Sequence, residues 1–199
     1  MKIVGRAKSR NKSLGWAQGL LFALGIVLLG YCAFVLVDAW IFQARESAQL
    51  GRFVPERAAP DAAALPVVGP DGSIGRMQVD RLGVSVVVME GTSDTTLRRA
   101  VGHIAGTALP GHAGNVGIAG HRDTFFRPLR NIHSNDIITL TTRVGEYRYR
   151  VVSTKIVHPD DVAVLNSDGT EVLTLVTCYP FYYLGSAPER FIVRAERVL

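Results

Sequence analysis

A long uncharged segment near the N-terminus, residues 14–37, constrains this chain more than any other feature. A helix rises about 1.5 Å per residue, so a segment of this length can cross a hydrocarbon core of about 30 Å. Asp38, Trp40 and Phe42 follow it, and such residues suit the interface where a helix leaves a membrane. We therefore predict one transmembrane helix, a signal anchor over residues 14–42.

The charges around this segment predict its orientation. A basic tail over residues 1–13 contains lysine and arginine and no acidic residue. The positive-inside rule places such a tail in the cytoplasm and the rest of the chain outside, so the cell membrane is crossed once. Residues 43–199 are nearly balanced, with 17 basic against 16 acidic residues, and the net charge of +5 therefore reflects topology. Membrane lipid is a predicted partner, and nucleic acid is not.

Two alternatives exist for the N-terminal segment. A cleaved signal peptide usually has an apolar region of about 7–15 residues and a small-x-small cleavage site, whereas this segment is longer and lacks a clear site near its end. The sequence Leu29-Gly30-Tyr31-Cys32 resembles a lipoprotein signal, but Tyr31 stands where a small residue is needed. We adopt the retained anchor, with Cys32 as an ordinary apolar residue within it.

The rest of the chain is predicted to form a connector over residues 43–71 and a globular domain over residues 72–199. The connector contains Pro55, Pro60, Pro66 and Pro70. Its first part, residues 43–50, can prolong the helix, and the remainder is expected to be a mobile or extended tether.

The globular domain is predicted to be mainly β. Apolar and β-branched residues dominate seven segments, several of them separated by glycine-containing turns. The expected strands are 77–79, 84–89, 116–119, 137–142, 147–157, 172–177 and 191–198. Short helices are expected over residues 92–101, capped by Thr92 or Ser93, and over residues 125–132. Many short strands with few helices favour a closed or nearly closed β-barrel.

A lone cysteine marks the candidate chemistry. Cys178 ends an apolar segment, and Cys32, the other cysteine of the chain, is predicted to lie in the membrane. An unpaired thiol in an oxidising compartment is usually either buried or used. Pro180 stops the strand just after Cys178, so the thiol is expected at a rim that a peptide can reach. The alternative is an ordinary buried cysteine.

Two further side chains complete the candidate site. His121 ends the apolar segment 116–120, and Arg190 begins the last one. A thiolate that attacks a carbonyl, an imidazole that moves protons and a guanidinium that holds the oxyanion are the parts of a cysteine transacylase. The alternatives are a structural histidine and a rim salt bridge from Arg190 to Glu189 or Glu196.

Other polar residues carry weaker predictions. Thr177 and Asp123 are candidate substrate-binding residues: Thr177 is expected to contact substrate or steady Arg190, and Asp123 to orient the loop of His121. The alternatives are simple strand packing and a surface carboxylate. His103 and His112 are expected to be solvated or capping. A metal site built from Cys178 and histidines lacks a compact ligand spacing, so no metal or cofactor is predicted.

At these residues the chain resembles the sortases, a family of membrane-bound cysteine transpeptidases. The matching elements are Gly120-His121, the family's TLxTC pattern at residues 174–178, and Arg190 before a final strand. The residues that follow His121 and Cys178 look most like the class D branch. The resemblance covers residues 74–198 and implies a closed eight-stranded β-barrel with its active site at the end of a groove.

The resemblance also implies a reaction. Cys178 would attack the Thr–Gly or Thr–Ala bond of an LPxTG-like sorting signal on a secreted protein, and an amine would resolve the thioacyl intermediate. His121 would act as general acid and then base, while Arg190 would hold the oxyanion and orient the peptide. The expected acceptor is a cell-wall precursor, with a pilin lysine as the alternative. A tethered module that binds peptides without cleaving them is the competing function.

Overall fold

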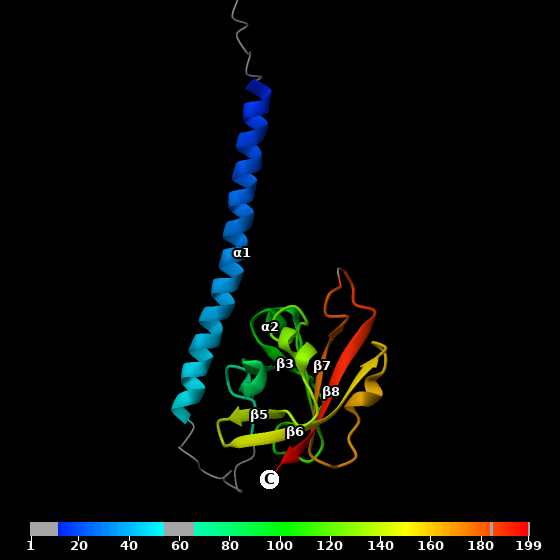
Figure 1. Ribbon diagram of the computed structural model, residues 1–199. Coiled ribbons are helices and arrows are strands. Elements are labelled where there is room, and N and C mark those ends of the chain that lie inside the picture. The colour runs from blue at the N-terminus through cyan, green and yellow to red at the C-terminus, as the bar shows by residue number, and fades with distance from the viewer. Residues whose placement is uncertain (1–11, 54–65, 184, 199) are drawn as a thin grey trace, which may run out of the picture. The chain divides into compact units, whose positions relative to one another are not determined.

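The computed structural model describes residues 12–53, 66–183 and 185–198, and the chain divides into two compact units, residues 1–38 and 39–199 (Figure 1). Helix α1 (Lys12–Phe53) begins in the first unit. Its segment Gly15–Arg45 has a mean hydropathy of 2.8, and by length and composition it can cross a membrane. The helix continues through residues 43–50, as predicted, whereas the tether expected over residues 54–65 lies outside the described residues.

The second unit contains a closed β-barrel of eight strands, which confirms the predicted fold class. Around the barrel the strands follow the order β1-β2-β3-β4-β7-β8-β6-β5. Their bounds are β1 (Ser73–Val79), β2 (Val84–Glu90), β3 (Val101–His103), β4 (Asn115–Ala119), β5 (Ile137–Thr142), β6 (Glu146–Val157), β7 (Val172–Tyr179) and β8 (Glu189–Val198). The pairs β2–β3 and β4–β7 are parallel, and the other neighbours are antiparallel.

The barrel interior follows from the alternation of side chains along each strand. Leu173 and Leu175 of β7 and Val193 of β8 are fully buried. Each buried side chain of this kind contributes about 1.5–3 kcal/mol relative to leaving it exposed. The largest buried side chain is Tyr149, whose hydroxyl donates to Glu171 Oε1 at 3.1 Å. Burial, together with the charge of Glu171, raises the pKa of Tyr149 well above its usual range.

The strand that the sequence analysis missed is β3, which has only three residues. The helix expected over residues 92–101 is shorter than predicted: α2 (Asp94–Arg99) is capped by the Ser93 side chain, which accepts from the Thr96 N–H at 3.2 Å. Ala100 is already extended, and Val101 belongs to β3. Three residues, one of them glycine, are too few for a strand periodicity to emerge.

The prediction that His103 is solvated or capping is wrong. His103 is 3% exposed on β3. Its Nδ1 lies 2.8 Å from Glu90 Oε2, and its Nε2 lies 2.9 Å from the Ala108 carbonyl oxygen. The ring therefore fixes the start of the loop between β3 and β4 inside the barrel wall.

A polar cluster around Arg81 joins two segments of the barrel. Arg81 belongs to the short helix η1 (Asp80–Leu82) and pairs with the Asp136 carboxylate just before β5. Its Nη2 also donates to the Asn131 carbonyl at 2.6 Å and lies 3.0 Å from His133 Nδ1. The hydrogen bond from Arg81 lowers the pKa of Asp136, so the carboxylate stays charged in this cluster.

The end of the predicted connector also contacts the barrel. The Asp71 carboxylate accepts from the Ser73 N–H at 3.1 Å and from Arg143 Nη2 at 3.0 Å. Burial alone would raise the pKa of Asp71, but the Ser73 bonds and the Arg143 charge lower it. This contact fixes the chain where it enters β1.

Candidate active site

The strands β7 and β8 bring Cys178 and Arg190 together, although the loop between the strands separates them in sequence (Figure 1). The two residues are direct partners in the antiparallel register. The Cα atoms of such partners lie about 4.5–5.5 Å apart, and their side chains share one face of the sheet. Both side chains are half-buried, so the thiol is neither sealed in the core nor fully in solvent.

The pairing of β4 with β7 brings His121 to the same place. These strands are parallel, and the register pairs Gly117 with Thr174 and Ala119 with Val176. The Gly120 N–H continues the ladder by donating to the Val176 carbonyl at 3.1 Å. His121 follows Gly120 directly, just past the end of β4, and Cys178 lies two residues beyond Val176 on β7. Because neighbouring strands are about 4.8 Å apart, continuing this register places the backbone of His121 close to that of Cys178.

Thr177 fixes this junction from inside the barrel. Its side chain is 2% exposed, and its hydroxyl donates to the Gly120 carbonyl at 2.7 Å. The bond joins the residue before Cys178 to the residue before His121. The Thr177 hydroxyl therefore links these two segments, and its expected contact with substrate or Arg190 stays a prediction.

Gly120 is required by close packing at the same junction. A Cβ atom at Gly120 would lie 2.8 Å from the ring of Phe126, which is fully buried. The Phe126 N–H in turn donates to the His121 carbonyl at 3.1 Å. The short helix η2 (Arg127–Asn131) follows directly, in the region where a short helix was predicted. The position of His121 is therefore fixed by the packing of Gly120 against the Phe126 ring and by the hydrogen bond from the Phe126 N–H to the His121 carbonyl.

Arg190 turns toward its own loop. Its Nη1 donates to the Glu189 carbonyl at 3.0 Å and to the Ala187 carbonyl at 3.3 Å. Among the described residues it forms no ion pair with Glu189 or Glu196, which were the expected partners of the alternative interpretation. Three aromatic rings, those of Tyr179, Phe181 and Phe191, pack beside the pair of strands with centroids 5.3–6.4 Å apart.

Arg122 was not among the residues selected from the sequence. This arginine follows His121, and its guanidinium binds the loop between β7 and β8, which follows Cys178 in the chain. Nη1 donates to the Pro180 carbonyl at 2.9 Å, and Nη2 donates to the Tyr183 carbonyl at 2.8 Å and to the Gly185 carbonyl at 3.1 Å. No sequence signal marks such a contact, because backbone carbonyls are present at every residue. Asp123 was predicted to orient the loop that contains His121. Its side chain is exposed and has no bonding partner within the described parts of the chain.

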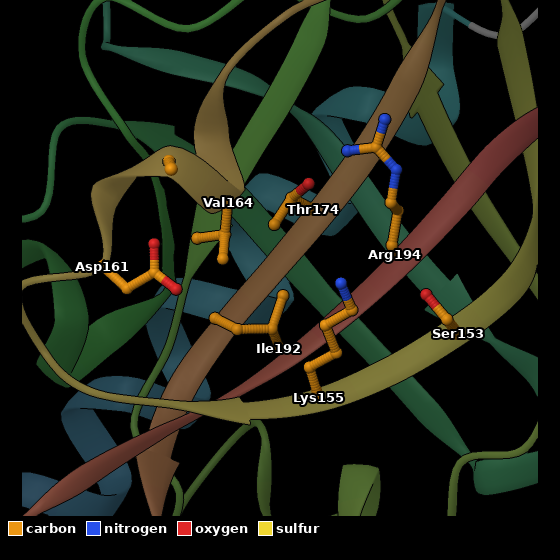
Figure 2. Close-up of a pocket in the computed structure, with 8 residues that line it drawn as sticks. Ser153, Lys155, Asp161, Val164, Thr174, Ile192 and Arg194 are labelled. Atoms are coloured by element: carbon orange, nitrogen blue, oxygen red, sulfur yellow. The ribbon is translucent and has the colours of Figure 1, made fainter.

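A pocket of about 300 Å³ lies on the same face of the sheet (Figure 2). The register pairs Thr174 with Arg194 and Val176 with Ile192, so this face continues from the Cys178–Arg190 pair along both strands. At about 3.3 Å per residue the pocket begins about 7 Å from that pair and extends to about 13 Å. Lys155 and Arg194 lie on one side of it, and Asp161 lies on the other, on the segment that leads to η3 (Val162–Leu165).

The arrangement has the parts for acyl transfer on a peptide. The half-buried thiol belongs to Cys178, which is the direct ladder partner of Arg190, and His121 follows the neighbouring strand β4. A thiol, an imidazole and a guanidinium are groups that acyl transfer can use. An elongated hollow leads away along the same face. Among the described residues, no three His, Cys, Asp or Glu side chains gather as ligands of a metal ion would.

The fold and this site together define a class of protein, a β-barrel enzyme with a thiol at the strand ends. A family model for the sortase domain matches residues 77–198, and the chain belongs to the sortase family, whose members are transpeptidases. It is 32% identical to Sortase D of Bacillus subtilis (strain 168) in an alignment of 191 residues that covers 89% of this chain and 96% of that protein.

Solved structures agree with this assignment. A sortase D5 transpeptidase of Clostridium perfringens is 30% identical, with a TM-score of 0.59, over 64% of this chain and 79% of that one. Sortase C1 of Streptococcus agalactiae is 28% identical, with a TM-score of 0.62, over 67% of this chain and 71% of that one. The chain is therefore a class D-like sortase, as its sequence predicted.

Proposed function

We propose that this sortase is a membrane-anchored transpeptidase that cleaves an LPxTG-like sorting signal and transfers the secreted protein to an amine such as a cell-wall precursor. The observation that carries the proposal is the row of His121, Cys178 and Arg190 at the ends of three adjacent strands. The membership of the sortase family supports the reaction class.

In the first step the Cys178 thiolate attacks the carbonyl carbon of the signal's threonine. The carbonyl oxygen becomes an oxyanion, and Arg190 binds it with N–H donors other than Nη1, which is held by the Ala187 and Glu189 carbonyls. The tetrahedral intermediate collapses when the C–N bond breaks, and His121 gives its proton to the departing amine. A thioester between the threonine carbonyl and Cys178 remains.

The second step reverses the first with a new amine. His121, now neutral, takes a proton from the incoming amine as its nitrogen attacks the thioester carbon. The C–S bond breaks, a new amide forms, and the thiolate and the imidazolium are restored. An extended signal peptide is expected to lie along the outer face of β7, with residues upstream of the threonine toward the pocket that Ile192 and Arg194 line.

The apolar helix supports a single-pass location. Segment Gly15–Arg45 anchors the enzyme with its basic tail in the cytoplasm, and the barrel then faces outward, where secreted substrates emerge. A membrane-impermeant thiol reagent on intact cells tests this orientation. Labelling of Cys178 is expected, and labelling only after lysis would contradict it.

The reaction is tested by mass spectrometry of the full-length chain in detergent, incubated with LPxTG-like or LPxTA-like peptides and an added amine. An acyl adduct on Cys178 and an amine-linked product are expected. Cys178→Ala should lose both, and Cys32→Ala, which removes the other cysteine, should keep them. A product without the amine would reduce the function to hydrolysis. Tight peptide binding with no adduct would instead indicate a peptide-binding module.

A further inference from the structure

Arg122 holds the loop between β7 and β8 by its backbone. Its two terminal nitrogens donate to the carbonyls of Pro180, Tyr183 and Gly185, at 2.8–3.1 Å. The guanidinium also lies 5.8 Å from the centroid of the Tyr183 ring. A planar guanidinium can serve several acceptors at once in a fixed geometry, which the single ammonium of a lysine cannot reproduce. One side chain thus ties down three points of the loop.

The same loop determines where Arg190 points. The Arg190 guanidinium is bound to the carbonyl of Ala187, in the last part of this loop, and to the carbonyl of Glu189, the first residue of β8. A shift of the loop backbone therefore moves the acceptors that hold the Arg190 side chain. Because Cys178 precedes the loop and Arg190 follows it, the loop connects the thiol to the guanidinium.

Arg122 also links this loop to the segment of the imidazole. It follows His121, whose carbonyl accepts from the Phe126 N–H at 3.1 Å and whose preceding residue is bound by Thr177. The side chain of Arg122 therefore joins two segments that flank Cys178 on opposite sides in sequence. Within the described residues its hydrogen-bond acceptors are all backbone carbonyls, and none is a carboxylate.

From these contacts we infer that Arg122 is a positioning residue for the transfer reaction: it fixes the β7–β8 loop so that the Arg190 guanidinium is aligned with the thiol of Cys178. The inference rests on the proposed function, because it assigns Arg190 to the oxyanion. A misplacement of about 1 Å at a reacting group costs about 100-fold in rate, so the loss of this alignment is expected to slow the thioester step strongly.

The test is single-turnover formation of the Cys178 thioester by the full-length chain in detergent, with an LPxTG-like peptide. Arg122→Ala is expected to slow the step about 10- to 100-fold at saturating peptide, and Arg122→Lys by less. The matched control is Arg127→Ala, an exposed arginine five residues further along, which should stay within about twofold.

A double-mutant comparison separates positioning from a general structural role. If Arg122 acts through Arg190, Arg122→Ala should slow the Arg190→Ala variant by less than about threefold, because the aligned group is already gone. Full multiplication of the two effects would overturn the inference, and so would an Arg122→Ala enzyme as fast as the wild type. If Arg122→Ala does not fold, the same comparison with Arg122→Lys decides.

Hydrogen exchange provides a readout that needs no substrate. In Arg122→Ala the amides at the two ends of the loop, Tyr179 and Glu189, which are ladder partners, should exchange at least about tenfold faster, while the amide of the β7 core residue Leu175 stays unchanged. A wild-type protein that forms no thioester would contradict the proposed function. The exchange result then decides the inference alone, and unchanged loop exchange overturns it.

Discussion

Two arginines, Arg81 and Arg122, each join segments that are distant in the sequence, but they do so with different partners. Arg81 pairs with the Asp136 carboxylate and adds the Asn131 carbonyl and a ring nitrogen of His133. Arg122 binds only backbone carbonyls and an aromatic ring. The first cluster contains groups that gain and lose protons, and the second contains none apart from the tyrosine.

The difference is instructive about what each place in the molecule requires. Away from the thiol, an ion pair can stabilise the barrel because its charge disturbs no chemistry. Beside Cys178 and His121, a carboxylate would favour a bound proton on the imidazole and oppose the thiolate. Carbonyl acceptors hold the loop with a smaller effect on those charges. The comparison predicts that changes at Arg81 affect stability and that changes around Cys178 affect rate.

The largest stability change is expected for Asp136→Ala. Asp136 is buried, and this variant leaves the His133 N–H, which donates to Asp136 Oδ2 at 2.8 Å, without its acceptor. We expect the free energy of unfolding to fall by about 1–3 kcal/mol. Urea unfolding of the full-length chain in detergent measures it. The rate of thioester formation per folded molecule should stay within about twofold of the wild-type rate. A tenfold fall in that rate would contradict the prediction that the Arg81 cluster affects only stability.

Thr177→Val tests whether a buried hydrogen bond at the candidate site affects the rate as well as the stability. It removes the hydroxyl that binds the Gly120 carbonyl, so His121 loses a support and the thioester rate is expected to fall about tenfold. Thr142→Val is the matched control, because Thr142 is also buried and its hydroxyl also donates to a glycine carbonyl, that of Gly145, at 3.0 Å. Both variants should lose about 1–2 kcal/mol of stability, but only Thr177→Val should lose rate.

Acid should weaken the Arg81 cluster and leave the Arg122 contacts in place. The pKa of Asp136 is lower in the folded chain than its ordinary value of 3.8. Its contribution to stability is therefore fully present above about pH 4 and is lost as the pH falls through the folded pKa. Thermal unfolding between pH 2 and pH 6 should show a smaller acid loss in Asp136→Asn than in the wild type. Equal losses would mean that other carboxylates, such as Asp71, account for the effect.

The smallest effect is expected for Arg130→Ala. The Arg130 guanidinium lies 5.4 Å from the centroid of the Tyr182 ring, which is 76% exposed. An exposed cation–π contact contributes about 0.5–1 kcal/mol, and among the described residues Arg130 donates to no carbonyl of the β7–β8 loop. The thioester rate should change less than about threefold. A loss as large as that of Arg122→Ala would show that ring contacts, and not carbonyl bonds, hold the loop.

Much of this molecule could be predicted from its sequence because two signals are strong. Alternating apolar residues located seven of the eight strands, and the strand-end positions of His121, Cys178 and Arg190 selected the candidate site. What remained hidden depends on partners without a sequence signature. The bonds of Arg122 and Thr177 go to carbonyls, and the burial of His103 depends on the three-residue strand β3. The catalytic roles of the three selected residues stay predictions.

The position of β8 in the barrel has a consequence for when the thiol becomes reactive. Although it is the last strand of the barrel in chain order, β8 lies between β7 and β6. Until it inserts, both of those neighbours have an unpaired edge and Cys178 has no guanidinium opposite it. The insertion of β8 therefore both closes the barrel and completes the row of His121, Cys178 and Arg190. Under the proposed function, a chain still emerging from the translocation machinery, or one clipped before Glu189, would carry Cys178 without the Arg190 guanidinium and would not transfer acyl groups.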